Sequence, residues 1–273
     1  MEEQKKIYLI MTNEPIYHSD SWREIFDYNG LRDFAAIWQL QTDFVEVPNK
    51  RHGGWSNVIC HTLQLPQGGA VQVYIKRQLS HHYYPLLSRI RGKAFLQREY
   101  KNLLKLKKEN ILVPQILYFS ERNNEKYQAI LILRALDEFI SLDKLAGRKV
   151  AFNLKKRITA SVAQMVRQFH QIPMRHNCFY NKHIFVQYPV PEQDPIHIAV
   201  IDLEKAKKAC AFLRASIRDL AKMYRYDSGF SRTDRLRFYK YYRQCGRLQL
   251  FDRLLIKYFE RKNKQKRKKH GKV

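Results

Sequence analysis

The feature that most constrains the fold of this chain is a short apolar run that ends in a single acid. Residues 197–203 read His-Ile-Ala-Val-Ile-Asp-Leu, so a β-branched segment closes on Asp202. This pattern predicts a buried strand that delivers one carboxylate to a site at its end. A histidine-rich turn at residues 176–185 precedes the run and is typical of a catalytic loop. We therefore expect the loop and Asp202 to form one site.

The first half of the chain is rich in strand patterns. Alternating residues predict a hairpin that joins residues 59–65 to residues 71–76 through the turn at Gln67-Gly68-Gly69. Further strands are predicted, and they lie at residues 7–10, 45–47, 116–120 and 129–133. Apolar residues at helical spacing predict helices near residues 30–39 and 91–108.

Two charged residues stand out in this half. Lys76 lies at the end of a predicted strand, and Glu99 lies within the apolar face of a predicted helix. Because a carboxylate beside an apolar face usually has a partner, Lys76 is the obvious candidate for Glu99. A surface lysine on an ordinary hairpin and a solvated glutamate are the alternatives.

The second half is predicted to be mainly helical, with helices over residues 152–171, 209–226 and 231–260. A β-rich half followed by an α-rich half predicts an α+β fold with two lobes. We expect an N-lobe over residues 1–133, a helical C-lobe over residues 134–260 and a basic disordered tail over residues 261–273.

Charge is the most unusual property of the composition. The chain has 51 Lys and Arg against 25 Asp and Glu, which gives a net charge of +26. Residues 261–273 hold eight of these cations and no acid, and subtracting eight from +26 still leaves +18 for the rest. Such a field attracts polyanions, which include nucleic acid, an anionic membrane surface and phosphorylated glycolipid. The tail is either a solvated end or an anion-binding segment, and it can be both.

Cysteine usage and hydropathy indicate the cellular compartment of the protein. The four cysteines (Cys60, Cys178, Cys210 and Cys245) form no C-x-x-C pair, so a disulfide framework or a structural zinc site is not expected. No apolar run approaches the roughly 18 residues that span a bilayer, and the apolar patch at residues 7–11 is too short for a signal-peptide core. These features predict a cytoplasmic protein.

Taken in order, these segments resemble a known family. The loop at residues 176–183 and Asp202 occupy the places of the H-R-D-x-x-x-x-N and D-F-G segments of protein kinases. The other residues that carry the resemblance are Gly53-Gly54-Trp55-Ser56-Asn57-Val58, Lys76, Glu99, Ile201-Asp202-Leu203-Glu204-Lys205-Ala206 and Arg218-Asp219-Leu220-Ala221. Over roughly residues 50–225 the chain resembles the lipopolysaccharide kinase (Kdo/WaaP) family, and most of all its InaA-like branch.

The resemblance implies a protein-kinase-like two-lobed fold with a β-rich N-lobe and an α-helical C-lobe. It also implies an enzyme that uses ATP and Mg²⁺ to phosphorylate a core sugar of lipopolysaccharide at the cytoplasmic face of the inner membrane. Carried over by position, Gly53 and Gly54 cover the phosphates. Lys76 pairs with the phosphates and is held by Glu99.

For the loop and the strand, the resemblance implies that Asp202 binds Mg²⁺ and that His183 stands at the second metal or loop-orienting position. The chain departs from the family at Cys178, where WaaP-type members keep the catalytic Asp. His176 is one candidate for a replacement base, since imidazole titrates near neutral pH. Cys178 as a nucleophile is a second candidate, and structural roles for His176 and His183 are the alternative.

Three functions from different classes remain open at this point. The first is a kinase acting on a sugar of lipopolysaccharide or a related phosphoglycan, with its basic surface and tail in peripheral contact with anionic membrane. The second is a pseudokinase that binds nucleotide or a partner without turnover, which Cys178 favours. The third is a nucleic-acid-binding protein. It rests on charge alone, because no RNA-binding motif accompanies that charge, so nucleic acid is not the expected partner.

Overall fold

The computed structural model describes residues 17–51, 54–80, 82–83, 93–123, 126–209, 212–224 and 230–269. The chain divides into two compact units. The first unit consists of Met1–Leu103 and Pro114–Asp137, and the second consists of Leu104–Val113 and Glu138–Val273. Strands dominate the first unit and helices dominate the second, so the α+β prediction is confirmed.

The first unit is built on an antiparallel six-stranded sheet with the order β1-β7-β8-β4-β3-β2. Its strands are β1 (Tyr17–His18), β2 (Asn49–Arg51), β3 (Gly54–Gln64), β4 (Ala70–Leu79), β7 (Ile116–Asn123) and β8 (Tyr127–Arg134). A separate two-stranded sheet joins β5 (His82–Tyr83) and β6 (Lys93–Ala94). Its helices are α2 (Asp20–Tyr28), α3 (Phe34–Gln39) and the first part of α4 (Phe95–Lys108), whose residues 104–108 belong to the second unit.

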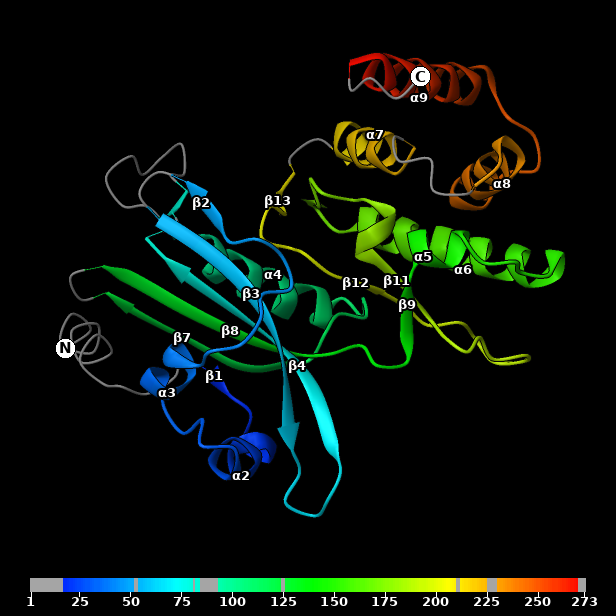
Figure 1. Ribbon diagram of the computed structural model, residues 1–273. Helices are drawn as coiled ribbons and strands as arrows, with labels where there is room; N and C mark the ends of the chain where they lie inside the picture. The colour runs from blue at the N-terminus through cyan, green and yellow to red at the C-terminus, as the bar shows by residue number, and fades with distance from the viewer. Residues whose placement is uncertain are drawn as a thin grey trace. The chain divides into compact units, whose positions relative to one another are not determined.

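The hairpin of β3 and β4 is the longest strand pair of this unit. Figure 1 shows the two strands as long neighbouring arrows joined by a tight turn. Their register runs from Trp55 opposite Leu79 to Gln64 opposite Ala70. Residues 68 and 69 have φ values of 94° and 86°, which glycine adopts without strain. The predicted hairpin and its glycine turn are therefore confirmed.

Alternation along β4 sends its side chains to two different faces of the sheet. Val73 and Ile75 are fully buried in a cluster that includes Phe26 of α2 and Phe34 of α3. Lys76 follows Ile75 and therefore points to the opposite face. On that face α4 packs against the sheet.

The sheet differs from the prediction at residues 45–47, where no strand forms. Only single contacts occur there: Phe44 bridges Ile59, and the Val45 amide donates to the Val58 carbonyl at 2.9 Å. Val47 is 91% exposed and precedes a proline, which has no amide to donate to a ladder. The strand predicted at residues 7–10 lies outside the described residues.

The second unit contains α5 (Leu142–Ala146), α6 (Phe152–Gln171), α7 (Phe212–Met223), α8 (Arg232–Arg243) and α9 (Leu250–Lys269). Its short elements are β9 (Phe139–Ser141), β10 (Met174–Arg175), the 3₁₀ turn η1 (Asn181–His183), β11 (Ile184–Gln187), β12 (Ile198–Val200) and β13 (Lys207–Lys208). Helix α6 packs against α7 and α8. Its buried residues recur at helical spacing: Ile158, Val162, Ala163, Met165, Val166 and Phe169.

A small three-stranded sheet with the order β12-β11-β9 positions the predicted site. Strand β12 is buried throughout, and its register places Val200 opposite Ile184 of β11. Residue 112, from far earlier in the chain, also holds β12: the Val200 amide donates to the Leu112 carbonyl at 3.0 Å. The strand that ends before Asp202 is thus fixed on two sides.

The basic tail differs from the expectation of disorder. Helix α9 continues through Lys269, so residues 261–269 are helical. Lysine and arginine are good helix formers, and α9 is already nucleated upstream by buried residues such as Phe259. Within the part of the chain that the structure describes, no helix is long and apolar enough to cross a bilayer.

Candidate active site

Asp202 lies two residues after β12, at the place where the sequence pattern predicts it. Its backbone has a φ of 61°, in the left-handed region that Asp and Asn tolerate better than most residues. The Ile201 amide donates to the His183 carbonyl at 3.1 Å, which extends the strand pairing as far as the carboxylate. The side chain of Asp202 is 27% exposed, so the carboxylate is held by a rigid strand yet open to a ligand.

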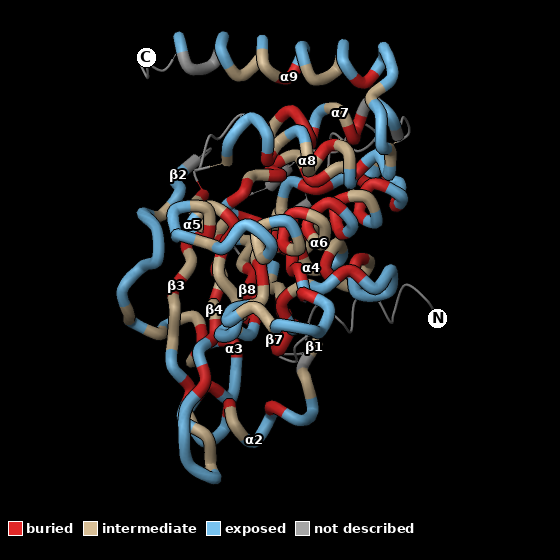
Figure 2. The backbone as a smooth tube through the Cα atoms, turned by 90° about the vertical axis from the view of Figure 1, so that its right-hand side faces the viewer, coloured by how far each residue is buried: buried red, intermediate tan, exposed pale blue. Residues whose placement is uncertain are grey.

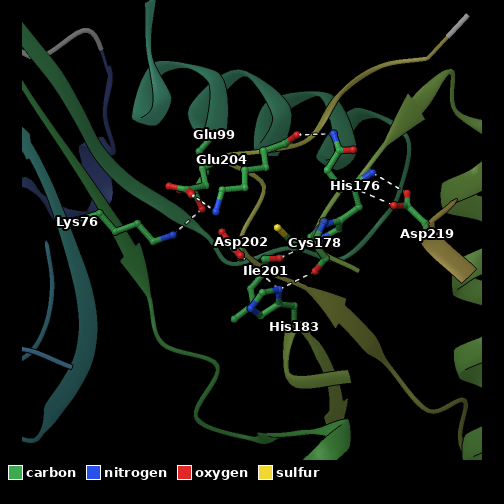
Figure 3. A network of polar contacts seen from close by, with 11 residues as sticks. Lys76, Glu99, His176, Cys178, His183, Ile201, Asp202, Glu204 and Asp219 are labelled. Atoms are coloured by element: carbon green, nitrogen blue, oxygen red, sulfur yellow. Dashed lines mark hydrogen bonds and ion pairs between the residues drawn. The ribbon is translucent and has the colours of Figure 1, made fainter. Parts of the chain in front are cut away.

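His183 is brought to Asp202 by this same pairing. Its Nδ1 lies 2.8 Å from the Cys178 carbonyl oxygen and 3.3 Å from Oδ2 of Asp202 (Figure 3). Because a carbonyl only accepts, Nδ1 carries a proton and donates it to the Cys178 carbonyl. His183 therefore braces the loop and orients Asp202 with one nitrogen.

The two side chains differ in how well they suit Mg²⁺. Mg²⁺ prefers oxygen ligands and is commonly held by one or two carboxylates together with water and substrate phosphates. Asp202 meets that need, and an imidazole such as that of His183 is a less suitable Mg²⁺ ligand. No cluster of three or more His, Cys, Asp or Glu side chains that could hold a metal occurs among the described residues. Asp202 thus fits a site that the nucleotide phosphates complete.

Asp219 anchors the start of the loop, and its role could not be assigned from the sequence. It is fully buried on α7, and its carboxylate accepts from the backbone amides of His176 at 2.8 Å and Asn177 at 3.1 Å (Figure 3). Asn177 in turn donates to the Lys205 carbonyl at 2.7 Å and has a φ of 66°. The carboxylate of Asp219 therefore fixes the backbone conformation of the loop.

Replacing Asp219 with asparagine is expected to lower the free energy of unfolding by about 2–4 kcal/mol, because a buried amide group would face a backbone N–H. Turnover should fall as well, because the loop loses its anchor. Urea unfolding and activity assays measure the two effects. Asp194→Asn removes an exposed carboxylate of the same unit, and it should change stability by less than about 0.5 kcal/mol. Equal behaviour of the two variants would contradict an anchoring role.

His176 is fully buried, and both of its ring nitrogens contact the backbone. Nε2 lies 3.1 Å from the Ile201 carbonyl, so it donates, and Nδ1 accepts from the Cys178 amide at 3.2 Å. Burial lowers the pKa of His176 to about 4, although the negative charges of Asp219 and Asp202 oppose this shift. A neutral ring enclosed in this way favours the structural role over the base that the sequence left open.

This shifted pKa predicts a specific acid sensitivity. The unfolded chain binds the His176 proton near the ordinary pKa of 6.5, and the folded chain binds it only near 4. Stability from this group is therefore complete above pH 6.5 and is lost as the pH falls towards 4. Between pH 7.5 and pH 5 we expect a loss of about 2 kcal/mol. Urea unfolding at both pH values should show a smaller loss in His176→Asn, and an equal loss would contradict the assignment.

Cys178, which stands where the resemblance implies a catalytic Asp, is buried. Burial raises the pKa of its thiol, and the negative charge of Asp202 raises it further. The thiol is therefore protonated at neutral pH, and it lacks the lowered pKa that an activated cysteine needs. This geometry does not favour the nucleophile that the sequence left as an alternative.

Lys76 and Glu99 form the predicted ion pair within the first unit. The Nζ–Oε1 distance is 2.6 Å, and the side chains are 18% and 1% exposed (Figure 3). Lys76 comes from β4 and Glu99 from the first turns of α4, which pack on the same face of the sheet. The carboxylate is thus buried with its countercharge, and it holds the lysine side chain in one direction.

Gly54 has a structural reason of its own. A Cβ at this position would lie 2.5 Å from the carbonyl oxygens of both Leu79 and Ser80, so no larger residue fits. This close approach of β3 to the end of β4 explains the glycine without reference to phosphate. The neighbouring Gly53 lies outside the described residues, so the predicted phosphate-covering turn stays a prediction.

Comparison with known proteins gives consistent results. Residues 35–242 match the Lipopolysaccharide kinase (Kdo/WaaP) family. Protein InaA of Escherichia coli is 25% identical over 199 residues, which cover 71% of this chain and 88% of InaA. Lipopolysaccharide core heptose(I) kinase WaaP of Pseudomonas aeruginosa is 24% identical over 188 residues, which cover 62% of this chain and 70% of WaaP.

A solved structure described as WaaP in complex with acyl carrier protein superposes on this chain with a TM-score of 0.64. The identity is 21%, and the match covers 92% of this chain and 98% of that chain. This likeness confirms the protein-kinase-like fold predicted from the sequence. Since the family match covers well over half of the 273 residues, the chain belongs to the lipopolysaccharide kinase (Kdo/WaaP) family.

Proposed function

We propose that this protein is an ATP-dependent kinase that phosphorylates a sugar hydroxyl of the lipopolysaccharide core or of a related phosphoglycan. The observation that carries the proposal is the carboxylate of Asp202, held on a rigid strand end beside His183 and partly open to solvent. The paired Lys76 and Glu99 supply the second element that phosphoryl transfer needs.

The chemistry agrees with these residues. Phosphoryl transfer passes through a loose transition state, so catalysis depends mainly on positioning and on neutralising charge. Lys76 holds phosphate oxygens, and Glu99 directs the lysine. Asp202 would hold Mg²⁺, which would neutralise phosphate charge, and His183 keeps the carboxylate oriented. A loose transition state also asks little of a general base, so the absence of the family Asp at position 178 is compatible with turnover.

The location proposed for this reaction is the cytoplasmic face of the inner membrane, where the enzyme is peripheral. The net charge of +26 supports attraction to phosphorylated glycolipid and to an anionic leaflet. Near such a leaflet each Lys or Arg contributes roughly 1 kcal/mol.

A second candidate function is that of a pseudokinase that binds nucleotide without turnover. One observation favours it: Cys178 is a buried, protonated thiol at the position where the resemblance implies a catalytic Asp. Both candidate functions include nucleotide binding, but only the kinase transfers phosphate.

One experiment separates the candidates. ATP binding is measured by calorimetry with and without Mg²⁺, and transfer of labelled phosphate to lipopolysaccharide core acceptors is then followed. Binding that depends on Mg²⁺ together with transfer supports the kinase. Binding without transfer to any acceptor supports the pseudokinase, and the absence of ATP binding rejects both.

A further inference from the structure

Two buried residues of helix α9 show which side of the helix faces the rest of its unit. Asp252 is 1% exposed and accepts from Tyr239 Oη at 2.9 Å, from Arg243 Nε at 3.0 Å and from the Gln249 amide at 3.0 Å. Seven residues later, on the same side of the helix, Phe259 is fully buried. The opposite side of α9 must therefore face away from the unit to which it belongs.

That outward side carries an apolar stripe. Leu250, Leu254 and Tyr258 follow one another at four-residue spacing and are 74%, 56% and 38% exposed. Phe251 lies beside them and is 46% exposed. Scattered single apolar residues are normal on a surface, but four neighbours on two turns form a contiguous patch that indicates an interaction site.

A cationic stripe borders the apolar stripe. Five exposed cations recur at spacings of three and four residues, so they share one side of the helix: Arg253, Lys257, Arg261, Lys264 and Lys268. Lys262 lies over the Tyr258 ring at 4.8 Å and adds a cation at the other border of the apolar stripe. The acids of α9 do not offset this charge, because Asp252 is buried and Glu260 pairs with Arg232 at 3.2 Å.

The apolar stripe and the cationic stripe together form the α9 surface. Figure 2 shows pale blue, exposed backbone along the turns of this helix. A helix with apolar residues beside a row of Lys and Arg has the character of those that lie in the plane of a membrane interface. Charge complementarity selects the kind of bilayer, because an uninterrupted cationic row favours anionic lipid.

We propose that the α9 surface is the membrane-docking element of this protein and that it lies flat on an anionic bilayer. Leu250, Phe251 and Leu254 enter the headgroup region, and the cations that follow contact lipid phosphates. This inference rests on the peripheral location in the proposed function and assigns it to a folded, two-sided helix. The sequence alone had suggested an unstructured basic tail.

The test uses the full chain and sedimentation with two kinds of vesicle, without nucleotide or acceptor. One kind is phosphatidylcholine alone, and the other contains phosphatidylglycerol as well. The apolar variant is Leu250→Ser/Phe251→Ser/Leu254→Ser, and the cationic variant is Lys257→Gln/Arg261→Gln/Lys264→Gln. Each is expected to reduce affinity for the anionic vesicles about 100-fold. The wild-type chain should bind the neutral vesicles far more weakly.

A matched control removes the same charge elsewhere. Lys101→Gln/Lys107→Gln/Lys108→Gln takes three exposed cations from α4. It should reduce affinity for anionic vesicles much less than the cationic variant of α9 does. Because all these side chains are exposed, melting followed by circular dichroism should be unchanged in every variant.

Four results would overturn the proposal. They are equal loss of binding in the α4 control, equal wild-type affinity for neutral vesicles, an apolar variant that binds like wild type, and a wild-type dimer that the apolar variant converts to a monomer. The last would assign the surface to a second copy of the chain. Kinase activity on a delipidated core saccharide is measured separately, so failure of docking is distinguished from failure of the proposed reaction.

Discussion

Replacing Asp202 with asparagine is expected to abolish Mg²⁺-dependent ATP binding and to reduce turnover on the order of 1,000-fold. The loss follows because the carboxylate is the group proposed to hold the metal, and metal neutralisation of phosphate charge is worth several kcal/mol. Asparagine keeps the size of the side chain and tolerates the φ of 61° at this position. Calorimetric titration of ATP with and without Mg²⁺, together with single-turnover phosphate transfer, measures both effects.

The control for this experiment is Asp194→Asn, which should bind ATP and Mg²⁺ as the wild type does. Circular dichroism should show that Asp202→Asn remains folded, because its carboxylate is only partly buried. If the variant keeps wild-type Mg²⁺-dependent affinity, Asp202 is a structural partner of His183 and the metal role is wrong. Most of the case for an active kinase would then be lost.

The second large effect is expected at the buried ion pair. Lys76→Met removes the ammonium that lies 2.6 Å from the Glu99 carboxylate, and breaking a buried pair in this way costs about 3–5 kcal/mol of stability. Adding Glu99→Leu removes the carboxylate as well and should restore most of that stability. Nucleotide affinity should stay low in both variants, because neither has the lysine that is proposed to hold phosphate.

The comparison of the single and double variants separates the effect of the ion pair on stability from the effect of Lys76 on nucleotide binding. Urea unfolding reports the stability, and ATP titration reports the affinity. Lys155→Met is the matched control, since Lys155 also pairs with an acid, Asp234, at 2.6 Å. It should lose stability without losing ATP affinity. Recovery of ATP affinity in Lys76→Met/Glu99→Leu would show that Lys76 has no part in nucleotide binding.

The sequence was enough to predict those elements that depend on residues close together in the chain. The hairpin of β3 and β4 follows from alternating residues and two glycines, and the strand before Asp202 follows from a β-branched run. The pairing of Lys76 with Glu99 was one of the alternatives that the sequence left open, because a carboxylate beside an apolar face usually has a partner.

Other features depend on partners that are distant in the sequence. Asp219 binds the backbone of a residue 43 positions earlier, and nothing in its own helix indicates this. The three-residue strand β9 is too short to give a periodic signal. The basic tail is helical because it continues α9. This helix begins upstream, where the Asp252 carboxylate accepts a hydrogen bond from the Gln249 amide. The sequence pattern indicated the charge of the basic tail but did not indicate that residues 261–269 are helical.

The division of the chain into units has a consequence for cutting and grafting. Leu112 holds the amide of Val200, yet it lies in sequence between α4 and β7, which is inside the span of the first unit. No single cut therefore yields both units intact. A fragment that starts at Glu138 lacks the residue that borders the strand before Asp202, and a fragment that stops at Leu103 lacks β7 and β8. The helical unit therefore cannot be transferred as one continuous segment, and any exchange with a relative must include residues 104–113.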